Sequence, residues 1–237
     1  MDMTTNLLDR SELQLAYPRP KTIPQQRPWI RANFATTVNG VIQMEGRSFG
    51  VSGPPDKTVF RFLRSISDAI LVGALTAQAE KYASPIPEPH SPKAPLLVVA
   101  TNSLNIEDSH KIFNEESPPL IATSNATFEA YPSKIERLSH RARFVAFGNR
   151  SIDFPQLFSY LRSQGITTLL CEGGPKLVSQ LLIAELVDEI CLTISPRIGN
   201  GTPTGFTNIG SSTPIEMHLE SSFEVDGYLF CRYMIAR

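Results

Sequence analysis

Two short stretches made only of apolar residues, 69–72 and 96–100, constrain the fold of this 237-residue chain most strongly. A third buried strand is predicted at 166–171, and helix-like patterns lie between these runs. Strands that are apolar at every position are buried on both faces, which is typical of a mostly parallel sheet covered by helices. We therefore predict an α/β fold with helices on both faces of a central sheet.

Hydrophobic periodicity and turn signals predict the remaining elements. Strands are expected at 29–38, 41–44, 120–123, 144–147, 189–195 and 228–236, and helices at 56–66, 75–81, 126–140, 153–164 and 175–186. No helical pattern separates the last two strand-like runs, so we expect antiparallel strands at one edge of the sheet.

The first 28 residues are polar and are interrupted by Pro18, Pro20, Pro24 and Pro28. We interpret residues 1–28 as an N-terminal extension and residues 29–237 as a single domain. The leucines at positions 7, 8, 13 and 15 predict a short helix that packs on the body of the domain or on a second subunit.

The composition limits the possible partners. A net charge of −1 gives no electrostatic reason to expect nucleic acid or an anionic membrane. No apolar run reaches the roughly 18 residues of a membrane span, and the N-terminus lacks the features of a signal peptide. Three cysteines, at 171, 191 and 231, are too few for a disulfide framework or a metal cluster. These features predict a cytoplasmic, reduced and soluble protein that binds no metal.

The turn Glu172-Gly173-Gly174-Pro175 joins a strand to a helix. Backbone N–H groups at a helix N-terminus favour an anion, and glycines allow a ligand to approach the backbone. The other interpretation is a tight connection without a ligand. Because residues 72–74 and 101–103 also follow strands, one extended ligand could contact all three strand ends.

Several short motifs occur in the order and spacing of a known family. They are residues 37–40, Ser52-Gly53, Leu63-Arg64, residues 68–73 with Thr76, residues 172–175, 181–182 and 186–189, and Ser195-Pro196 with Gly199 and Gly201. With these motifs the chain resembles the pyrimidine reductases of riboflavin biosynthesis, which form the C-terminal half of the bifunctional deaminase–reductase and also occur as stand-alone enzymes. The zinc signature of the deaminase half is absent from the sequence.

The resemblance implies a dihydrofolate-reductase-like fold, NADPH as cofactor, a small-molecule pyrimidine-type substrate and a homodimer. It implies reduction of 5-amino-6-(5-phosphoribosylamino)uracil, with hydride transfer to C1′ of the ribosylamino group. The alternatives are a paralogous NADPH-dependent reductase of another pyrimidine or pterin-like substrate, and a nucleotide-binding module without turnover.

The same resemblance assigns site residues by position. The expected cofactor-binding residues are Met44, Ser48, Val72, Gly73, Ala74, Thr76, Gly173 and Gly174, to which Thr101 is added from its place at a strand end. The expected substrate-binding residues are Asn39, Ser52, Arg64 and Glu172. Glu172 is also the candidate catalytic residue, either positioning the substrate or relaying a proton, unless it only caps the following helix.

The chain departs from the family pattern on the substrate side. The family places an Asp-Asp/Asn-Pro-x-Leu-x-x-Arg segment after the threonine that matches Thr76, and this chain has an unrelated sequence at 77–85. Asn39 stands where the family has aspartate. Arg64 contacts a phosphate or forms an ordinary ion pair, and the loops at Asn39, Ser48 and Ser52 could be turns alone. The sequence therefore predicts the cofactor better than it predicts the substrate.

Overall fold

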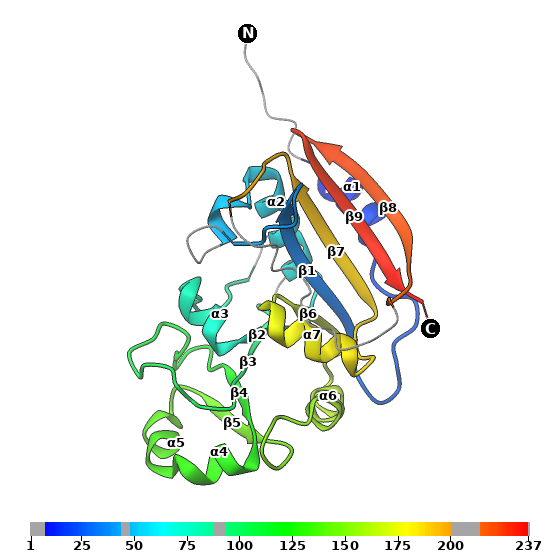
Figure 1. Cartoon of the computed structure of the whole chain (residues 1–237). Coiled ribbons are helices and arrows are strands. Elements are labelled where there is room, and N and C mark those ends of the chain that lie inside the picture. The colour runs from blue at the N-terminus through cyan, green and yellow to red at the C-terminus, as the bar shows by residue number, and fades with distance from the viewer. Residues whose placement is uncertain (1–7, 44–47, 88–92, 201–213, 237) are drawn as a thin grey trace.

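The computed structural model describes residues 8–43, 48–87, 93–200 and 214–236. Its centre is a nine-stranded sheet with the order β5-β4-β3-β2-β6-β1-β7-β9-β8, around which the helices are arranged (Figure 1). The strands are β1 (Trp29–Thr37), β2 (Ala69–Gly73), β3 (Leu96–Ala100), β4 (Leu120–Thr123), β5 (Arg143–Ala146), β6 (Thr168–Cys171), β7 (Glu189–Ser195), β8 (Met217–Val225) and β9 (Tyr228–Ile235). The helices are α1 (Arg10–Ala16), α2 (Pro54–Ser65), α3 (Ala74–Ala79), α4 (Asn125–Ala130), α5 (Pro132–Leu138), α6 (Phe154–Ser163) and α7 (Pro175–Ile183), with a 3-10 turn η1 at Ser48–Gly50.

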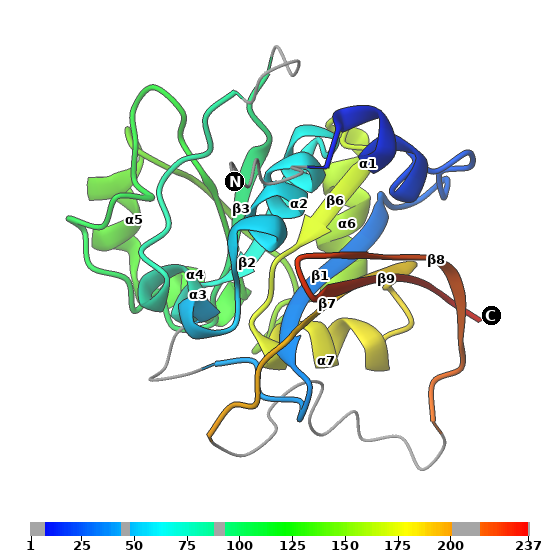
Figure 2. The same ribbon diagram turned by 90° about the horizontal axis from the view of Figure 1, so that it is seen from above.

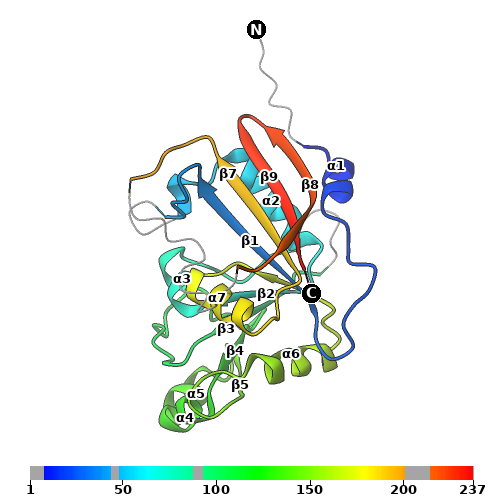
Figure 3. The same cartoon turned by 45° about the vertical axis from the view of Figure 1, so that its right-hand side comes forward.

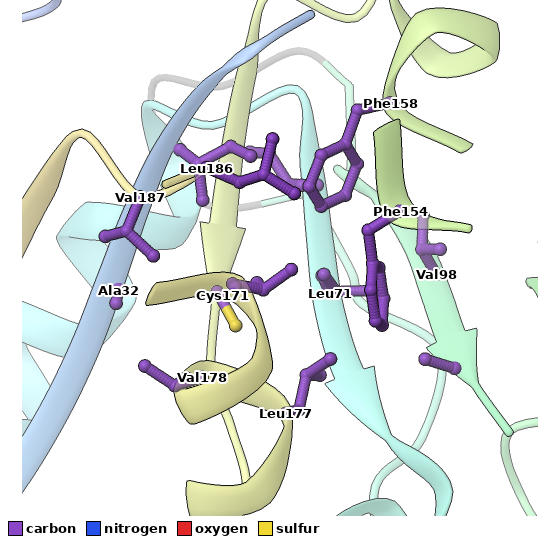
Figure 4. Packing of buried hydrophobic residues seen from close by; sticks show 14 of the residues in the cluster. Ala32, Leu71, Val98, Phe154, Phe158, Cys171, Leu177, Val178, Leu186 and Val187 are labelled. Carbon is purple, nitrogen blue, oxygen red and sulfur yellow. The ribbon is translucent and has the colours of Figure 1, made fainter. Parts of the chain in front are cut away.

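Helices cover both faces of the sheet, as predicted (Figure 2). Alternate residues of each apolar strand point to opposite faces. Leu71 and Cys171 pack against α6 and α7, with Phe158 of α6 above them (Figure 4). On the opposite face, Leu170 packs against α1 and α2. Burial on both sides explains why these strands contain almost no polar residue.

The antiparallel edge is also confirmed, but it contains one strand more than expected. Strand β7 pairs antiparallel with β9, and β9 pairs with β8. We did not predict β8, most of whose side chains are exposed, although its residues Phe223 and Val225 pack against the core. The strand forms because its backbone groups pair with β9.

Helix α1 packs on the body of the domain beside the β8–β9 hairpin (Figure 3). The buried Tyr17 ring meets the Phe223 ring edge-on at 5.9 Å between centroids. The Ser221 hydroxyl donates to the Ala16 carbonyl over 3.0 Å. Of the two positions predicted for this helix, the one on the body of the domain is observed.

Two predicted elements are wrong in detail. Residues 41–43 form no strand, because the chain turns at Gly40 and the Val41 N–H donates to the Thr37 hydroxyl. The helix predicted at 126–140 is divided into α4 and α5 at Tyr131, where Pro132 begins a new helix. The helix after Asp153 is confirmed, and the Asp153 carboxylate accepts the Gln156 N–H as an N-cap over 2.9 Å.

Candidate active site

The turn after β6 is fixed to the neighbouring strand β2. The Glu172 N–H donates to the Leu71 carbonyl over 2.9 Å, and the Gly73 N–H donates to the Gly173 carbonyl over 2.8 Å. Gly173 has a φ of +90°, and its peptide bond to Gly174 is cis. A Cβ on Gly174 would lie 2.5 Å from the Thr76 hydroxyl oxygen, so the starts of α3 and α7 approach each other without space for a side chain.

A glycine-lined cleft of about 510 Å³ lies along the ends of β2, β3 and β6. Its lining includes Gly73, Ala74, Leu75, Thr76, Thr101, Asn102, Ser103, Asn105, Gly174, Lys176, Leu177 and Gln180. The three strand ends that were predicted to share one ligand therefore do border one cleft. The volume is in the range of small-molecule and cofactor sites.

A second space, the charged cavity, has a volume of about 440 Å³ and adjoins the glycine-lined cleft. Both spaces are bordered by Gln43, Thr76, Gly174 and Pro175. The charged cavity is further lined by Phe34, Ser48, Ser52, Asp56, Lys57, Phe60, Arg64, Glu80, Lys81, Tyr82 and Glu172. Two ligands in these spaces would meet at the shared wall.

Arg64, Glu172 and Tyr82 form a hydrogen-bonded group in the wall of the charged cavity. Two guanidinium nitrogens of Arg64 donate to the two Glu172 oxygens over 2.7 and 2.6 Å, and the Tyr82 hydroxyl donates to Oε2 over 2.6 Å. The Glu172 side chain is 2% exposed and that of Arg64 is 21% exposed. Burial and the neighbouring Glu172 carboxylate raise the pKa of the Tyr82 phenol well above its ordinary value. The group combines a buried ion pair with a tyrosine that keeps its proton.

The end of α3 brings Tyr82 into this group. Lys81 has a φ of +53°, and the Tyr82 N–H donates back to the Ala77 carbonyl over 2.8 Å, which turns the chain sharply. The preceding Glu80 accepts the Ser48 N–H over 2.7 Å and so connects α3 to η1. Residues 80–82, which do not match the family pattern, therefore build one wall of the charged cavity.

Asp56 is a buried carboxylate in another part of the same cavity. It is the third residue of α2, is 7% exposed, and accepts the Ser52 hydroxyl over 2.5 Å. Burial raises the pKa of the Asp56 carboxyl, although the hydroxyls of Ser52 and Thr193 and the charge of Lys57 act in the opposite direction. A helix N-terminus also favours a negative charge at this position.

The structure brings most of the predicted site residues together. Gly73, Ala74, Thr76, Thr101 and Gly174 line the glycine-lined cleft, and Ser52, Arg64 and Glu172 line the charged cavity. Ser48, which we expected on the cofactor side, also borders the charged cavity.

Four predicted residues lie elsewhere or cannot be placed. The buried side chain of Val72 packs in the core beside Val99, one residue before the cleft. Gly173 shapes the turn and is absent from the lining of the cleft. The Asn39 amide exchanges two hydrogen bonds of 2.9 Å with the Gly199 backbone and fixes the loop after β7. Met44 lies outside the described residues.

The sequence analysis did not identify several residues of the charged cavity. They are Asp56, Lys57, Phe60, Glu80, Lys81 and Tyr82. The sequence indicates Asp56 only as the start of a helix and Tyr82 only as part of a segment that departs from the family pattern. Among the described residues, no group of three His, Cys, Asp or Glu side chains is arranged to hold a metal, and no helix is long and apolar enough to span a membrane.

The glycine-lined cleft and the charged cavity adjoin at the ends of the parallel strands, which is where open α/β sheets bind their ligands. Comparisons with known proteins identify the class of protein, an oxidoreductase with a dihydrofolate-reductase-like fold. Residues 28–229 match the family model described as "RibD C-terminal domain", and the chain belongs to this family. The resemblance to riboflavin-pathway reductases is therefore confirmed.

Relatives in two organisms have names that specify an activity. The chain is 32% identical over 180 residues to 2,5-diamino-6-ribosylamino-4(3H)-pyrimidinone 5′-phosphate reductase of Methanothermobacter thermautotrophicus, across 74% of this chain and 81% of the relative. It is 30% identical over 194 residues to the protein of the same name in Archaeoglobus fulgidus, across 75% of this chain and 85% of the relative.

Solved structures support the same fold. A pyrimidine reductase-like protein of Corynebacterium diphtheriae superposes with a TM-score of 0.80 at 26% identity, covering 95% of this chain and 98% of that protein. Dihydrofolate reductase of Enterococcus faecalis superposes with a TM-score of 0.50 at 16% identity, covering 91% of this chain and all (100%) of that protein. The predicted fold class is confirmed.

Proposed function

We propose that this chain is an NADPH-dependent reductase of riboflavin biosynthesis that converts a 5-phosphoribosylamino-pyrimidine to its ribitylamino form. The wall shared by the glycine-lined cleft and the charged cavity carries the proposal, because a cofactor and a substrate bound there would touch at Thr76 and Gly174. The names of the two reductase relatives support the substrate class.

The residues of the glycine-lined cleft fit a dinucleotide. Gly73 borders the cleft without a side chain, and the N-terminus of α7 favours a pyrophosphate. Lys176 and Ser103 supply a cation and a hydroxyl for the additional phosphate that distinguishes NADPH from NADH. When bound, the cofactor supplies the hydride that reduces C1′ of the substrate.

The charged cavity supplies groups for a phosphorylated sugar. Lys57 and Lys81 line it and can attract the phosphate, although the family segment after Thr76 is missing. Glu172 already accepts hydrogen bonds from Arg64 and Tyr82. We therefore assign Glu172 a positioning role, in which it holds Arg64 and Tyr82 in the wall that faces the sugar, in preference to the relay of a proton.

The test is an assay of the purified protein with NADPH and two substrates, the 2,5-diamino-pyrimidinone ribosylamino phosphate and its uracil counterpart. We expect loss of NADPH absorbance and a ribitylamino product by mass spectrometry with at least one of them. Tight NADPH binding without oxidation would instead indicate a nucleotide-binding module. Oxidation with a pterin and with neither pyrimidine would indicate a paralogous reductase.

We also propose that the enzyme is cytoplasmic, as its composition predicts, and a homodimer, as its resemblance to the family implies. In the described chain, β8 is one of the two edge strands of the sheet and pairs only with β9, and its residues Met217 and Leu219 are exposed. Sedimentation equilibrium would show a mass of two chains, and a single-chain mass at micromolar concentration would contradict this part of the proposal.

A further inference from the structure

Two sequence motifs that have no part in the reaction proposed above lie side by side in the fold. The turn at Asn39 follows β1, and residues 196–200 follow β7, the parallel neighbour of β1. The Asn39 amide donates to the Gly199 carbonyl and accepts the Gly199 N–H, each over 2.9 Å. The Val38 N–H donates to the Arg197 carbonyl over 3.0 Å. These three hydrogen bonds join the two loops directly beyond the sheet.

The loop that leads from β1 to α2 forms part of the wall of both binding spaces. Four of its residues line the charged cavity, namely Ile42, Gln43, Ser48 and Ser52. Gln43 also borders the glycine-lined cleft, whereas the described residues of the loop after β7 line neither space. That loop nevertheless contacts the first loop near both of its ends, because the Arg197 guanidinium donates to the Gly50 carbonyl over 2.7 Å. The loop after β7 therefore fixes a loop that carries site residues.

The amide of Asn39 suits this connection better than the aspartate that the family has at the same position. An amide carries donors and an acceptor, so it can exchange two hydrogen bonds with one backbone unit. An ionised aspartate only accepts, and one of its oxygens would face the Gly199 carbonyl oxygen. The Thr37 hydroxyl donates to Oδ1 of Asn39 over 2.7 Å and holds the side chain in this orientation. The departure from the family pattern is therefore the group that joins the loops.

We propose that Asn39 is a positioning residue of the reaction and not one of its substrate ligands. It lines neither binding space, but it connects the loop after β7 to the loop between β1 and α2. The connection fixes Gln43 at the wall where cofactor and substrate meet. This inference rests on the proposed function, because it concerns the alignment of the two ligands. A small misplacement caused by a distant substitution slows the chemical step strongly.

The experiment measures kcat and KM of Asn39→Ala and Asn39→Asp with the ribosylamino phosphate that the wild type reduces. We expect both variants to lower kcat by about 10- to 100-fold, with KM and the dissociation constant for NADPH within about threefold of the wild type. The matched control is Asn114→Asp, which adds the same charge. The Asn114 side chain only accepts, from the N–H groups of Glu116 and Ser117, so aspartate keeps both bonds and kcat should not change.

A second variant tests the same connection without a change at Asn39. Arg197→Ala shortens an exposed side chain and removes its bond to the Gly50 carbonyl, so kcat should fall by about threefold to tenfold. An unchanged kcat would contradict the role of the loop after β7. Hydrogen exchange reports the connection directly, and the Gly199 amide should exchange about tenfold faster in Asn39→Ala than in the wild type.

The outcomes separate this inference from the proposed function. Turnover by the wild type with an unchanged kcat in Asn39→Ala would overturn the inference and leave the reductase function intact. A higher KM at an unchanged kcat would also overturn it, since Asn39 would then be a substrate ligand. A lower kcat in Asn39→Asp alone would be an effect of the added charge and would overturn it as well. If the wild type reduces neither pyrimidine, the proposed function fails and the positioning role with it, whereas the exchange rate at Gly199 would still report whether the loops are joined.

Discussion

The glycine-lined cleft and the charged cavity share a wall but are built in different ways. The cleft is formed by the ends of neighbouring strands and by small residues close to them, such as Gly73, Ala74 and Gly174. The cavity is formed by large charged and aromatic side chains from β1, α2, the end of α3 and the turn after β6. A site formed by backbone at the strand ends follows directly from the order of the strands. A site formed by side chains requires that residues far apart in the sequence lie side by side in the fold. The cavity is therefore where this chain can differ from its relatives.

The largest effect is expected from Arg64→Ala, which tests whether side-chain pairing supports the cavity. It would leave the Glu172 carboxylate buried without its cation, and the free energy of unfolding should fall by about 3–5 kcal/mol in urea denaturation. The control is Arg137→Ala, which breaks the pair with Asp108 where the Arg137 side chain is 59% exposed, and it should cost about 1 kcal/mol or less. Equal losses in the two variants would contradict the structural role of the Arg64–Glu172 pair.

Gly174→Ala tests the close approach that forms the cleft. The added methyl group would lie 2.5 Å from the Thr76 hydroxyl oxygen, and overpacking of this kind costs about 1–3 kcal/mol. We also expect weaker NADPH binding by calorimetry. The double variant Gly174→Ala/Thr76→Ala removes the contacting oxygen, so it should recover part of the lost stability and part of the lost NADPH affinity. If the effects of the two substitutions simply add, the contact between Gly174 and Thr76 does not determine the shape of the cleft.

Lys81 tests the cavity in another way, because it combines a charge with a positive φ. Lys81→Gly and Lys81→Ala both remove the cation, and each should raise KM for the phosphorylated substrate by about tenfold. Glycine adopts the left-handed conformation without the cost of about 1 kcal/mol that alanine has, so the glycine variant should be the more stable one. If KM for a dephosphorylated substrate rises equally, Lys81 does not contact the phosphate.

The smallest expected effect is the pH dependence that Asp56 adds to stability. Because the pKa of Asp56 is higher in the folded protein than its usual value of about 3.9, the folded state retains this proton when the unfolded state has lost it. Stability from this group is present below the unfolded pKa and decreases as pH rises through the folded pKa. The free energy of unfolding of Asp56→Asn should therefore rise relative to that of the wild type as the pH increases from acidic to neutral. Urea denaturation at both pH values measures this difference. If the pKa of Asp56 were ordinary, the difference would be the same at both.

The sequence predicted the parts of the molecule in which local pattern and burial agree. The apolar strands β2, β3 and β6 were placed correctly because burial on both faces leaves a pattern in the sequence itself. Strand β8 was missed because most of its side chains are exposed and its alternation of apolar and polar residues is interrupted at the register irregularity between Leu219 and Ser221. A short strand was predicted at 41–44; after the turn at Gly40, the backbone groups of Val41 instead bond to the backbone N–H and the hydroxyl of Thr37, and residues 41–43 form no strand.

The same distinction applies to the candidate site. The strand ends at Gly73, Thr101 and Gly174 could be predicted, because parallel strands bring their ends to one edge. The partnership of Tyr82 with Glu172 could not, because it joins positions 90 residues apart through a turn with no sequence signal at Lys81. The sequence around Asp56 likewise indicates only the start of a helix, because its place in the cavity depends on how α2 packs in the fold.

The central claim is that the cleft and the cavity bring a nicotinamide cofactor and a ribosylamino-pyrimidine together at their shared wall. Its most direct measurement is the transfer of deuterium from NADPH labelled at the reactive C4 position of the nicotinamide. We predict one deuterium at C1′ of the ribitylamino product by mass spectrometry and NMR. An unlabelled product, or bound NADPH with no product from either pyrimidine, would contradict the account.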